Sequence, residues 1–523
     1  MYNIIGSGNA GDADVSRIPW WKFIALGVVF FLWLCTESPG HNWGGDFSHY
    51  LLHAVNLVEG RPYADIGYIQ NAFSFVGPAV YPPVFPVVLA PVYFFLGLDW
   101  IALKAVVVIA FSLALYLVTS LQGNKLGKMH QLAIIIFLAL NPYFWWLKDQ
   151  ILSDFLFLLT GLAMLSLLDK RYIKEKGGYR DIKNKNWGFA VPMGLLLYLS
   201  FATREIGIVF IPAVLFFELF HFKKISLVTC VALLIFLGLA GIQSVGLKAP
   251  AADSEMNGRI AELARDQGVD GENVSNSDYF NLNITNMGKQ VVRYASEMRV
   301  LWPETENIFV KTASWIAFLL ALLVTFAAYI RAVLSGPGML EVFVAGYLAV
   351  LVLFSGFQGL RYLVPLIPIF LFYAFTFHHQ LLHSRYRKIM IVIAAFFAGT
   401  TAISYASSYD VYLDRQNHGI TSPDATAFFE YVKDSTPEAS TFLFQKPRVL
   451  SLLTRRSASA WPHNRDPEFL PGYVNAIGAD YLVYSNIDQY GQSHPVDSVP
   501  LPGNKFSLEY NNDSFYVYKL NTR

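Results

Sequence analysis

Gly44-Gly45-Asp46-Phe47-Ser48-His49-Tyr50 is a polar, acidic stretch that lies directly after the first long apolar segment of the chain, residues 20–35. The glycine pair frees the backbone immediately before a lone carboxylate. Apolar residues then recur at helical spacing over residues 50–58. The stretch therefore predicts an acidic loop followed by a short helix, at the end of an apolar segment.

The composition places the chain among membrane proteins. Hydrophobic residues make up 54% of the 523 residues and charged residues 15%, and the mean hydropathy is +0.40. Apolar runs recur along most of the sequence, which indicates a mainly α, polytopic transmembrane protein. The formal net charge of +1 does not favour nucleic acid as a partner. Cys35 and Cys230 both lie inside apolar runs, so neither a disulfide nor a CxxC metal site is expected.

About eleven segments are candidate spans, since a helix needs about 20 apolar residues to cross a bilayer. Some of these segments are short for a full crossing. A further apolar stretch, residues 81–98, carries four prolines, which disfavour a regular helix; we interpret it as re-entrant or interfacial. The candidate spans are residues 20–35, 100–121, 130–140, 151–168, 187–201, 206–220, 225–245, 309–330, 340–355, 362–377 and 389–405.

Basic residues orient these spans, because lysine and arginine are concentrated in cytoplasmic loops. If residues 81–98 do not cross, the lysine-rich loop 170–185 lies inside, and the N-terminus is inside and the C-terminus outside. If they do cross, that loop falls outside, so the first topology is favoured. It predicts that these segments share the outer face: loops 37–83, 141–150 and 246–308, the start of the span at Asp154, and the turns 203–205 and 358–361.

The sequence divides at the end of the last span. Residues 1–406 form the predicted transmembrane domain, and residues 407–523 form a predicted extracytoplasmic domain. In the latter, residues 425–432 have the pattern of an amphipathic helix. Short strands are predicted at residues 441–444, 481–483 and 515–518, which together indicate a small α/β domain.

Charged residues beside the spans are candidate functional groups, because such positions are energetically costly. Asp154 begins a span and has two interpretations, a helix N-terminal cap or a functional carboxylate, with Asp149 as a competitor for the second. Arg204 has the same ambiguity: it is a snorkelling residue or a partner of Glu205, or else it binds phosphate through its two-pronged guanidinium group. Arg361 has the same interpretations. Two arginines on the same face and at the same depth in the membrane favour a phosphate-binding role over either alternative.

Asp46, His49 and His53 are spaced so that a helix places them on one face. This spacing is compatible with a divalent metal, with His49 and His53 as ligands. The polar lining of a wet cleft is the favoured interpretation, and nothing else in the sequence identifies a cofactor.

Five short motifs occur in the same order as in a known family. The chain resembles the GT-C superfamily of integral-membrane glycosyltransferases, over residues 20–405. It is most similar to the branch that contains protein O-mannosyltransferases and lipid A aminoarabinose transferases. The motifs are Asp46 with Tyr50 and Ala54-Val55-Asn56-Leu57; Tyr81-Pro82-Pro83; Ser153-Asp154; Thr203-Arg204-Glu205-Ile206-Gly207; and Arg361-Tyr362 with Pro365 and Pro368.

The chain also departs from the family pattern. The first loop of the family often has Asp-Glu, whereas Phe47 follows Asp46 here. The second acidic residue is often Glu, whereas Asp154 is shorter. The loop 246–308 and the C-terminal domain match no specific motif, and we expect acceptor selection to reside there.

The resemblance implies a reaction. The donor is a sugar on a polyprenyl phosphate, and the acceptor is a hydroxyl of a lipid, a glycan or a protein. Asp46 acts as the general base of an inverting displacement and Asp154 orients the acceptor or the base. The implied substrate-binding residues are Arg204, Arg361 and Lys148, which neutralise the phosphate, with Tyr50, Tyr81 and Tyr362.

This activity implies a place in the bacterial inner membrane, with the site facing the periplasm. The competing hypothesis is a flippase or transporter for a polyprenyl-linked glycolipid, in which the charged residues line a pathway. Transporters usually place such groups near the midplane and often show internal repeats. Here the charges gather at one face and the two halves do not match, which favours an enzyme. A non-enzymatic receptor or scaffold is a third alternative, which leaves the two arginines unexplained.

Overall fold

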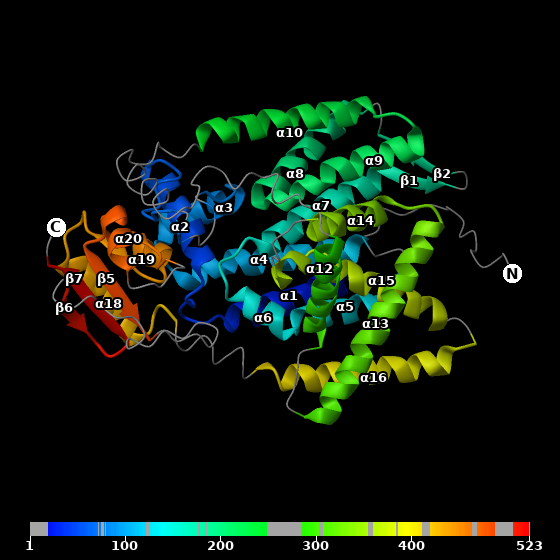
Figure 1. Ribbon diagram of the computed structural model, residues 1–523. Helices are drawn as coiled ribbons and strands as arrows, with labels where there is room; N and C mark the ends of the chain where they lie inside the picture. Colours follow the sequence, from blue (N-terminus) through cyan, green and yellow to red (C-terminus); the bar gives the residue numbers. More distant parts are fainter. Residues whose placement is uncertain are drawn as a thin grey trace.

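The computed structural model describes residues 19–71, 73–74, 78, 80–121, 126–175, 178–183, 186–247, 284–302, 307–353, 359–382, 385–409, 419–462, 468–486 and 506–521. Most of the predicted loop 246–308, namely residues 248–283 and 303–306, therefore lies outside the described residues, as does Gln358 of the turn 358–361. The molecule is elongated, with a bundle of helices at one side and a small β-sheet domain at the other (Figure 1).

The bundle is mainly α-helical, as predicted. Apolar side chains cover most of the helices, which then satisfy their own backbone hydrogen bonds. The helices are α1 (Trp20–Cys35), α2 (Gly45–Glu59), α3 (Val84–Leu96), α4 (Trp100–Leu121), α5 (Lys128–Ala139), α6 (Pro142–Lys148), α7 (Asp154–Arg171), η1 (Trp187–Phe189), α8 (Ala190–Thr203), η2 (Glu205–Val209), α9 (Phe210–Phe222), α10 (Leu227–Gly246), α12 (Ile284–Glu297), η4 (Met298–Leu301), α13 (Ile308–Leu334), α14 (Met339–Leu353), η5 (Leu360–Leu363), α15 (Ile367–Leu382) and α16 (Arg387–Ala406).

Among the described residues, five helical segments are long and apolar enough to cross a membrane: α4, η2 with α9, α10, α13 and α16. The bent pair α5 and α6, at 61° to each other, makes a sixth, and α1, α3, η1 with α8, α14 and α15 are shorter apolar helices. The chain is thus a multi-pass membrane protein, and the number of about eleven spans stays a prediction.

The proline-rich stretch 81–98 is more regular than predicted. It forms the 13-residue helix α3, with Pro86 in its first turn and Pro91 inside it. A proline in the first turn of a helix lacks an N–H that would have no partner within the helix, so only Pro91 removes a backbone hydrogen bond of α3. The prolines were expected to disfavour a regular helix over this stretch, and that expectation is wrong for residues 84–96. The helix is nevertheless short for a crossing, so its interfacial position stays a prediction.

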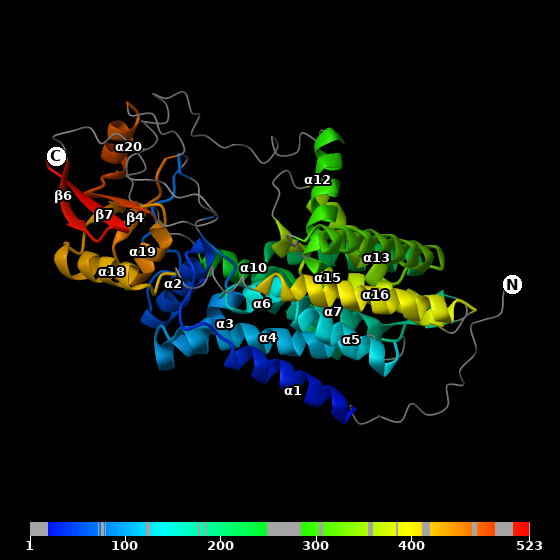
Figure 2. The ribbon, with the colours of Figure 1, turned by 90° about the horizontal axis from the view of Figure 1, so that it is seen from below.

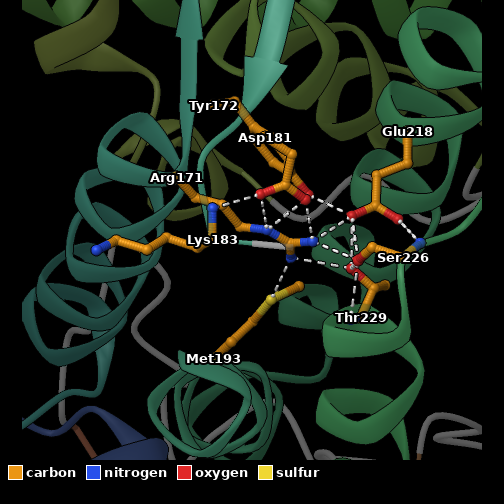
Figure 3. A network of polar contacts seen from close by, with 8 residues as sticks. All are labelled: Arg171, Tyr172, Asp181, Lys183, Met193, Glu218, Ser226 and Thr229. Atoms are coloured by element: carbon orange, nitrogen blue, oxygen red, sulfur yellow. Dashed lines mark hydrogen bonds and ion pairs between the residues drawn. The ribbon is translucent and has the colours of Figure 1, made fainter. Parts of the chain in front are cut away.

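The lysine-rich loop forms an unpredicted antiparallel hairpin, β1 (Tyr172–Glu175) and β2 (Gly178–Asp181). It lies at the end of the bundle opposite to the C-terminal sheet (Figure 1). Arg171 is completely buried beneath it and binds Asp181 at 2.7 Å and Glu218 at 2.6 Å (Figure 3). This network ties the hairpin to α7 and α9, because a buried guanidinium requires carboxylate partners.

The C-terminal domain contains a five-stranded mixed sheet in the order β4-β3-β5-β7-β6. Strand β3 is parallel to β4 and to β5, whereas β7 is antiparallel to its neighbours β5 and β6. Figure 2 shows the helices α18 and α20 on different sides of the sheet. The elements are α18 (Pro423–Ser435), β3 (Thr441–Leu443), α19 (Pro447–Thr454), β4 (Ser457–Ser459), α20 (Leu470–Ile477), β5 (Tyr481–Ser485), β6 (Phe506–Asn511) and β7 (Phe515–Leu520).

The helix at 425–432 and the three predicted strands of this domain are confirmed as α18, β3, β5 and β7, whereas β4, β6, α19 and α20 were not predicted. The sheet is not an independent unit beside the bundle. Tyr68 of the loop 37–83 forms a parallel bridge with Ala458, and Trp43 packs against Phe429 and Phe515. These contacts dock the loop 37–83 on the C-terminal domain, so one apolar core runs through both.

Candidate active site

Charged side chains from four predicted outer segments meet in one cluster. Arg361 of η5 donates to Asp46 at the start of α2, with 2.5 Å between Nη1 and Oδ2. The same guanidinium donates from Nη2 and Nε to Oδ2 of Asp154, at 2.9 and 3.1 Å. Arg204, which follows α8, donates to the other oxygen of Asp154. The prediction that these segments share one face of the bundle is confirmed, whereas which face is extracytoplasmic stays a prediction.

Asp154 is the buried centre of this cluster. Its side chain is 1% exposed, and it is the first residue of α7, where a negative charge is favoured by the helix dipole. The N-cap position of α7 is occupied by Ser153, and the carboxylate of Asp154 binds two arginines. Arg204 correspondingly binds Asp154 and stacks on the ring of Tyr362, 4.3 Å from its centroid. Neither arginine is a simple snorkelling residue.

Asp46 is the accessible carboxylate, with its side chain 30% exposed. Its Oδ1 accepts a hydrogen bond of 2.8 Å from the Tyr81 hydroxyl. Burial by itself would raise the pKa of Asp46, but the charges of Arg361 and Arg448 and the hydrogen bonds from Arg361 and Tyr81 outweigh it, and the pKa lies well below its usual range. Asp46 is therefore ionised throughout the neutral pH range.

A third arginine comes from the C-terminal domain and was not predicted. Arg448, on α19, lies 3.7 Å from Asp46 and donates to the Tyr81 hydroxyl at 3.2 Å. Its side chain is 3% exposed. A Cβ added at Gly45 would lie 3.0 Å from its guanidinium, so the glycine permits this approach. The glycine pair before Asp46 was the signal in the sequence, but the arginine that requires it lies in another domain.

Lys446 adds positive charge to the same place. It is half-buried at the N-terminal end of α19, within electrostatic reach of Asp46. Burial and the charge of Arg448 lower the pKa of Lys446, Asp46 opposes both, and the net pKa is about 8. The ammonium group is thus protonated at neutral pH and becomes neutral in mildly alkaline solution.

The histidines of α2 are hydrogen-bonded to other groups of the protein. His53 donates from Nδ1 to the carbonyl of Tyr63 at 2.7 Å, because its Nε2 accepts from the Tyr81 amide at 3.1 Å. Nδ1 of His49 accepts from Arg448 at 3.0 Å. In the described part of the chain no group of three or more His, Cys, Asp or Glu is placed to hold a metal. The residues present therefore do not fit the divalent metal considered from the sequence.

Two of the predicted substrate-binding tyrosines, Tyr50 and Tyr362, contact Ser153 and Arg204 respectively. The Tyr50 hydroxyl is bonded to Ser153 Oγ at 2.9 Å, beside Asp154, and its side chain is buried. Tyr362 lies under Arg204. Tyr81, the third, bridges Asp46 and Arg448 through its hydroxyl. The structure thus brings all three tyrosines to the cluster, with Tyr81 in direct contact with the accessible carboxylate.

Lys148 is the predicted site residue that the structure places elsewhere. Its ammonium is completely buried, 2.8 Å from Asp149 and 2.8 Å from the carbonyl of Thr36. Asp149 also binds Lys104 at 3.2 Å. Because these charges satisfy one another in a separate network, Lys148 is not presented to a phosphate in the cluster, and Asp149 does not compete with Asp154.

The cluster has the electrostatics of an anion site. Three guanidinium groups, from Arg204, Arg361 and Arg448, face only two carboxylates among the described residues, and Lys446 lies nearby. Arg361 is 26% exposed, so the excess positive charge is reachable from outside. Guanidinium groups in such an arrangement bind phosphate oxygens in pairs. An accessible carboxylate thus lies beside a site suited to a phosphate.

Comparisons with known proteins identify the fold. No family model matches the chain, and no curated protein matches its sequence. Its structure is similar to that of the archaeal oligosaccharyltransferase AglB from Archaeoglobus fulgidus in complex with an inhibitory peptide and a dolichol-phosphate, with a TM-score of 0.57 and 12% identity over 89% of this chain and 69% of AglB. It is also similar to ArnT from Cupriavidus metallidurans bound to undecaprenyl phosphate, with a TM-score of 0.52 and 14% identity over 96% of this chain and 98% of ArnT. Both are GT-C superfamily membrane glycosyltransferases, so the predicted resemblance is confirmed at the level of the fold.

Proposed function

We propose that this chain, which has the fold of the GT-C membrane glycosyltransferases, transfers a sugar from a polyprenyl-phosphate donor to an acceptor hydroxyl. The reaction takes place on the extracytoplasmic face, in a bacterial inner membrane. The observation that supports it best is the accessible Asp46 carboxylate held beside an excess of guanidinium charge. A phosphate leaving group and an acceptor that must lose a proton need these two features.

In the proposed reaction the acceptor oxygen attacks the anomeric carbon as the bond from that carbon to the phosphate oxygen breaks. The electron pair leaves with the phosphate, and Asp46 takes the proton of the acceptor hydroxyl. One displacement inverts the anomeric centre. The phosphate departs without protonation, so a second protein acid, as in the two-carboxylate glycoside hydrolases, is not required.

Arg361 connects the two halves of this mechanism. In the structure its Nη1 is bonded to Asp46, which makes the carboxylate a weak base. A bound donor phosphate would compete for the same guanidinium, and loss of that ion pair would raise the pKa of Asp46. The base would thus be strengthened when the donor is in place. Asp154 would keep Arg361 and Arg204 oriented during this exchange.

The function is tested in proteoliposomes with a panel of radiolabelled polyprenyl-phosphate sugars. We expect the native chain to transfer the sugar, or to release it to water, and Asp46→Asn to lose this turnover by about 10²–10⁴-fold while it still binds the lipid. Asp65→Asn is the matched control, because Asp65 is an exposed carboxylate of the same loop and lies outside the cluster.

Two outcomes would contradict the proposal. Turnover that is unchanged in Asp46→Asn would remove the base from the mechanism. Lipid scrambling that survives Asp46→Asn, with no turnover of any donor, would replace the transferase by the flippase considered from the sequence.

A further inference from the structure

A cavity of about 220 Å³ lies beside the cluster, between the end of α8, the start of η2, the last turn of α10 and residues 80–82. Tyr81 belongs to both: it lines the cavity and its hydroxyl donates to Asp46. None of the three arginines of the cluster lines the cavity. A group bound there would therefore lie next to the proposed base and outside the proposed phosphate site.

Three side chains of the cavity lining offer hydrogen-bond acceptors, and one of them, Gln243, also carries an amide donor. Glu205 is exposed, and because its neighbour Arg204 turns to Asp154, its carboxylate has no partner within the described ranges. Oε1 of Gln243 is buried and accepts no hydrogen bond from any residue that the structure describes. Ser244 donates its proton to the carbonyl of Gly241 at 2.8 Å, so its oxygen remains an acceptor.

These groups select the ligand by its chemistry. Acceptors on the protein require donors on the ligand, that is, hydroxyl or amine groups, since a buried acceptor left unpaired is costly. The Glu205 carboxylate would repel an anion. Phe201 and Tyr81 supply aromatic walls. Pockets for drug-sized ligands measure about 300–1,000 Å³, so a cavity of about 220 Å³ suits one ring-sized group and not a polyprenyl chain.

We propose that this cavity binds a neutral or cationic, hydroxyl- or amine-bearing sugar ring of the acceptor and presents its hydroxyl to Asp46. The inference rests on the proposed function and narrows the acceptor from any hydroxyl compound to a glycan or a sugar-containing lipid. Glu205 and Gln243 are the residues that recognise the ring, and Tyr81 is the wall shared with the site of reaction.

The test uses the full-length protein, purified in detergent, and saturation-transfer NMR with methyl glucoside, glucosamine and glucuronate as soluble probes. We expect the first two to bind, glucosamine more tightly, and glucuronate to be rejected. Glu205→Gln is expected to weaken glucosamine binding about tenfold and to reduce the discrimination against glucuronate, since one charge-assisted hydrogen bond is lost. Gln243→Leu is expected to weaken the binding of both methyl glucoside and glucosamine. Glu430→Gln is the control, because Glu430 is an exposed glutamate on α18, a helix that contributes no residue to the cavity lining.

Three results would overturn the inference: no binding of any probe to the native protein, glucuronate binding as tightly as methyl glucoside, or affinities unchanged in both cavity variants. A competition experiment then separates acceptor from donor. Polyprenyl-phosphate sugar that displaces glucosamine, where polyprenyl phosphate without sugar does not, would assign the cavity to the donor sugar and contradict our assignment.

The failure of this inference can be told apart from failure of the proposed function. Donor turnover that depends on Asp46, with no probe bound in the cavity, would leave the transferase in place and remove only the acceptor site. Probe binding without turnover of any donor would show that the cavity binds sugars and would remove the transferase activity.

Discussion

Replacing each of the two carboxylates of the cluster by asparagine should distinguish the structural role of Asp154 from the role of Asp46 as the base. Asp154 is 1% exposed and holds both Arg204 and Arg361, so Asp154→Asn leaves two largely buried guanidinium groups without their shared anion. Removing one partner of a buried ion pair costs about 3–5 kcal/mol. Asp46 is 30% exposed and its pairs are partly solvated, so Asp46→Asn should cost only about 0–1 kcal/mol.

The assay is the apparent melting temperature of each variant in detergent, followed by tryptophan fluorescence, together with donor turnover in proteoliposomes. Asp154→Asn should melt several degrees below the native protein, and its residual activity should scale with the folded fraction and the affinity for donor. Asp46→Asn should melt within about one or two degrees of the native protein, since 1 kcal/mol shifts the midpoint of a large domain by only a few degrees, and should be inactive.

The reverse pattern would refute this division. If Asp154→Asn melted like the native protein and had no turnover, Asp154 would take part in the chemistry itself. If Asp46→Asn were destabilised as strongly as Asp154→Asn, Asp46 would be a structural member of the ion-pair cluster.

Further outcomes are expected from the same structure. Gly45→Ala should lower donor turnover, because the added Cβ would lie 3.0 Å from the Arg448 guanidinium and displace it; unchanged turnover would contradict the contact. The affinity for donor should weaken as the pH rises through about 8, where Lys446 loses its charge, and this should disappear in Lys446→Arg; an identical pH profile in both would exclude Lys446. Glu218→Ala should destabilise the protein by about 3–5 kcal/mol, measured as melting temperature, because it removes a partner of the buried Arg171; an unchanged melting temperature would show that Asp181 and the hydroxyl partners suffice.

The local patterns of the sequence predicted the helical elements well. Helix α16 and the strands β3, β5 and β7 lie close to their predicted ranges, because hydropathy and a high content of apolar and aromatic residues are local properties of a segment. The hairpin in the lysine-rich loop was missed because it is tied to the bundle by an ion pair between Asp181 and the buried Arg171, a contact that hydropathy does not record. Helix α3 is the opposite case: the local pattern disfavoured a helix because of its prolines, yet the structure forms one with Pro91 inside it.

The sequence by itself determined the membrane class, the family resemblance and the convergence of Asp46, Asp154, Arg204 and Arg361 at one end of the bundle. The membrane class and the shared location of these residues follow from the spacing of apolar segments and the distribution of basic residues along the chain. The resemblance follows from five short motifs in a common order. Only the tertiary structure decided which charges pair with which. It placed Lys148 in a separate buried network, and it brought Arg448 to His49 from 399 residues away. Such pairs depend on how the C-terminal domain docks on the loop 37–83, and no pattern of neighbouring residues records that contact.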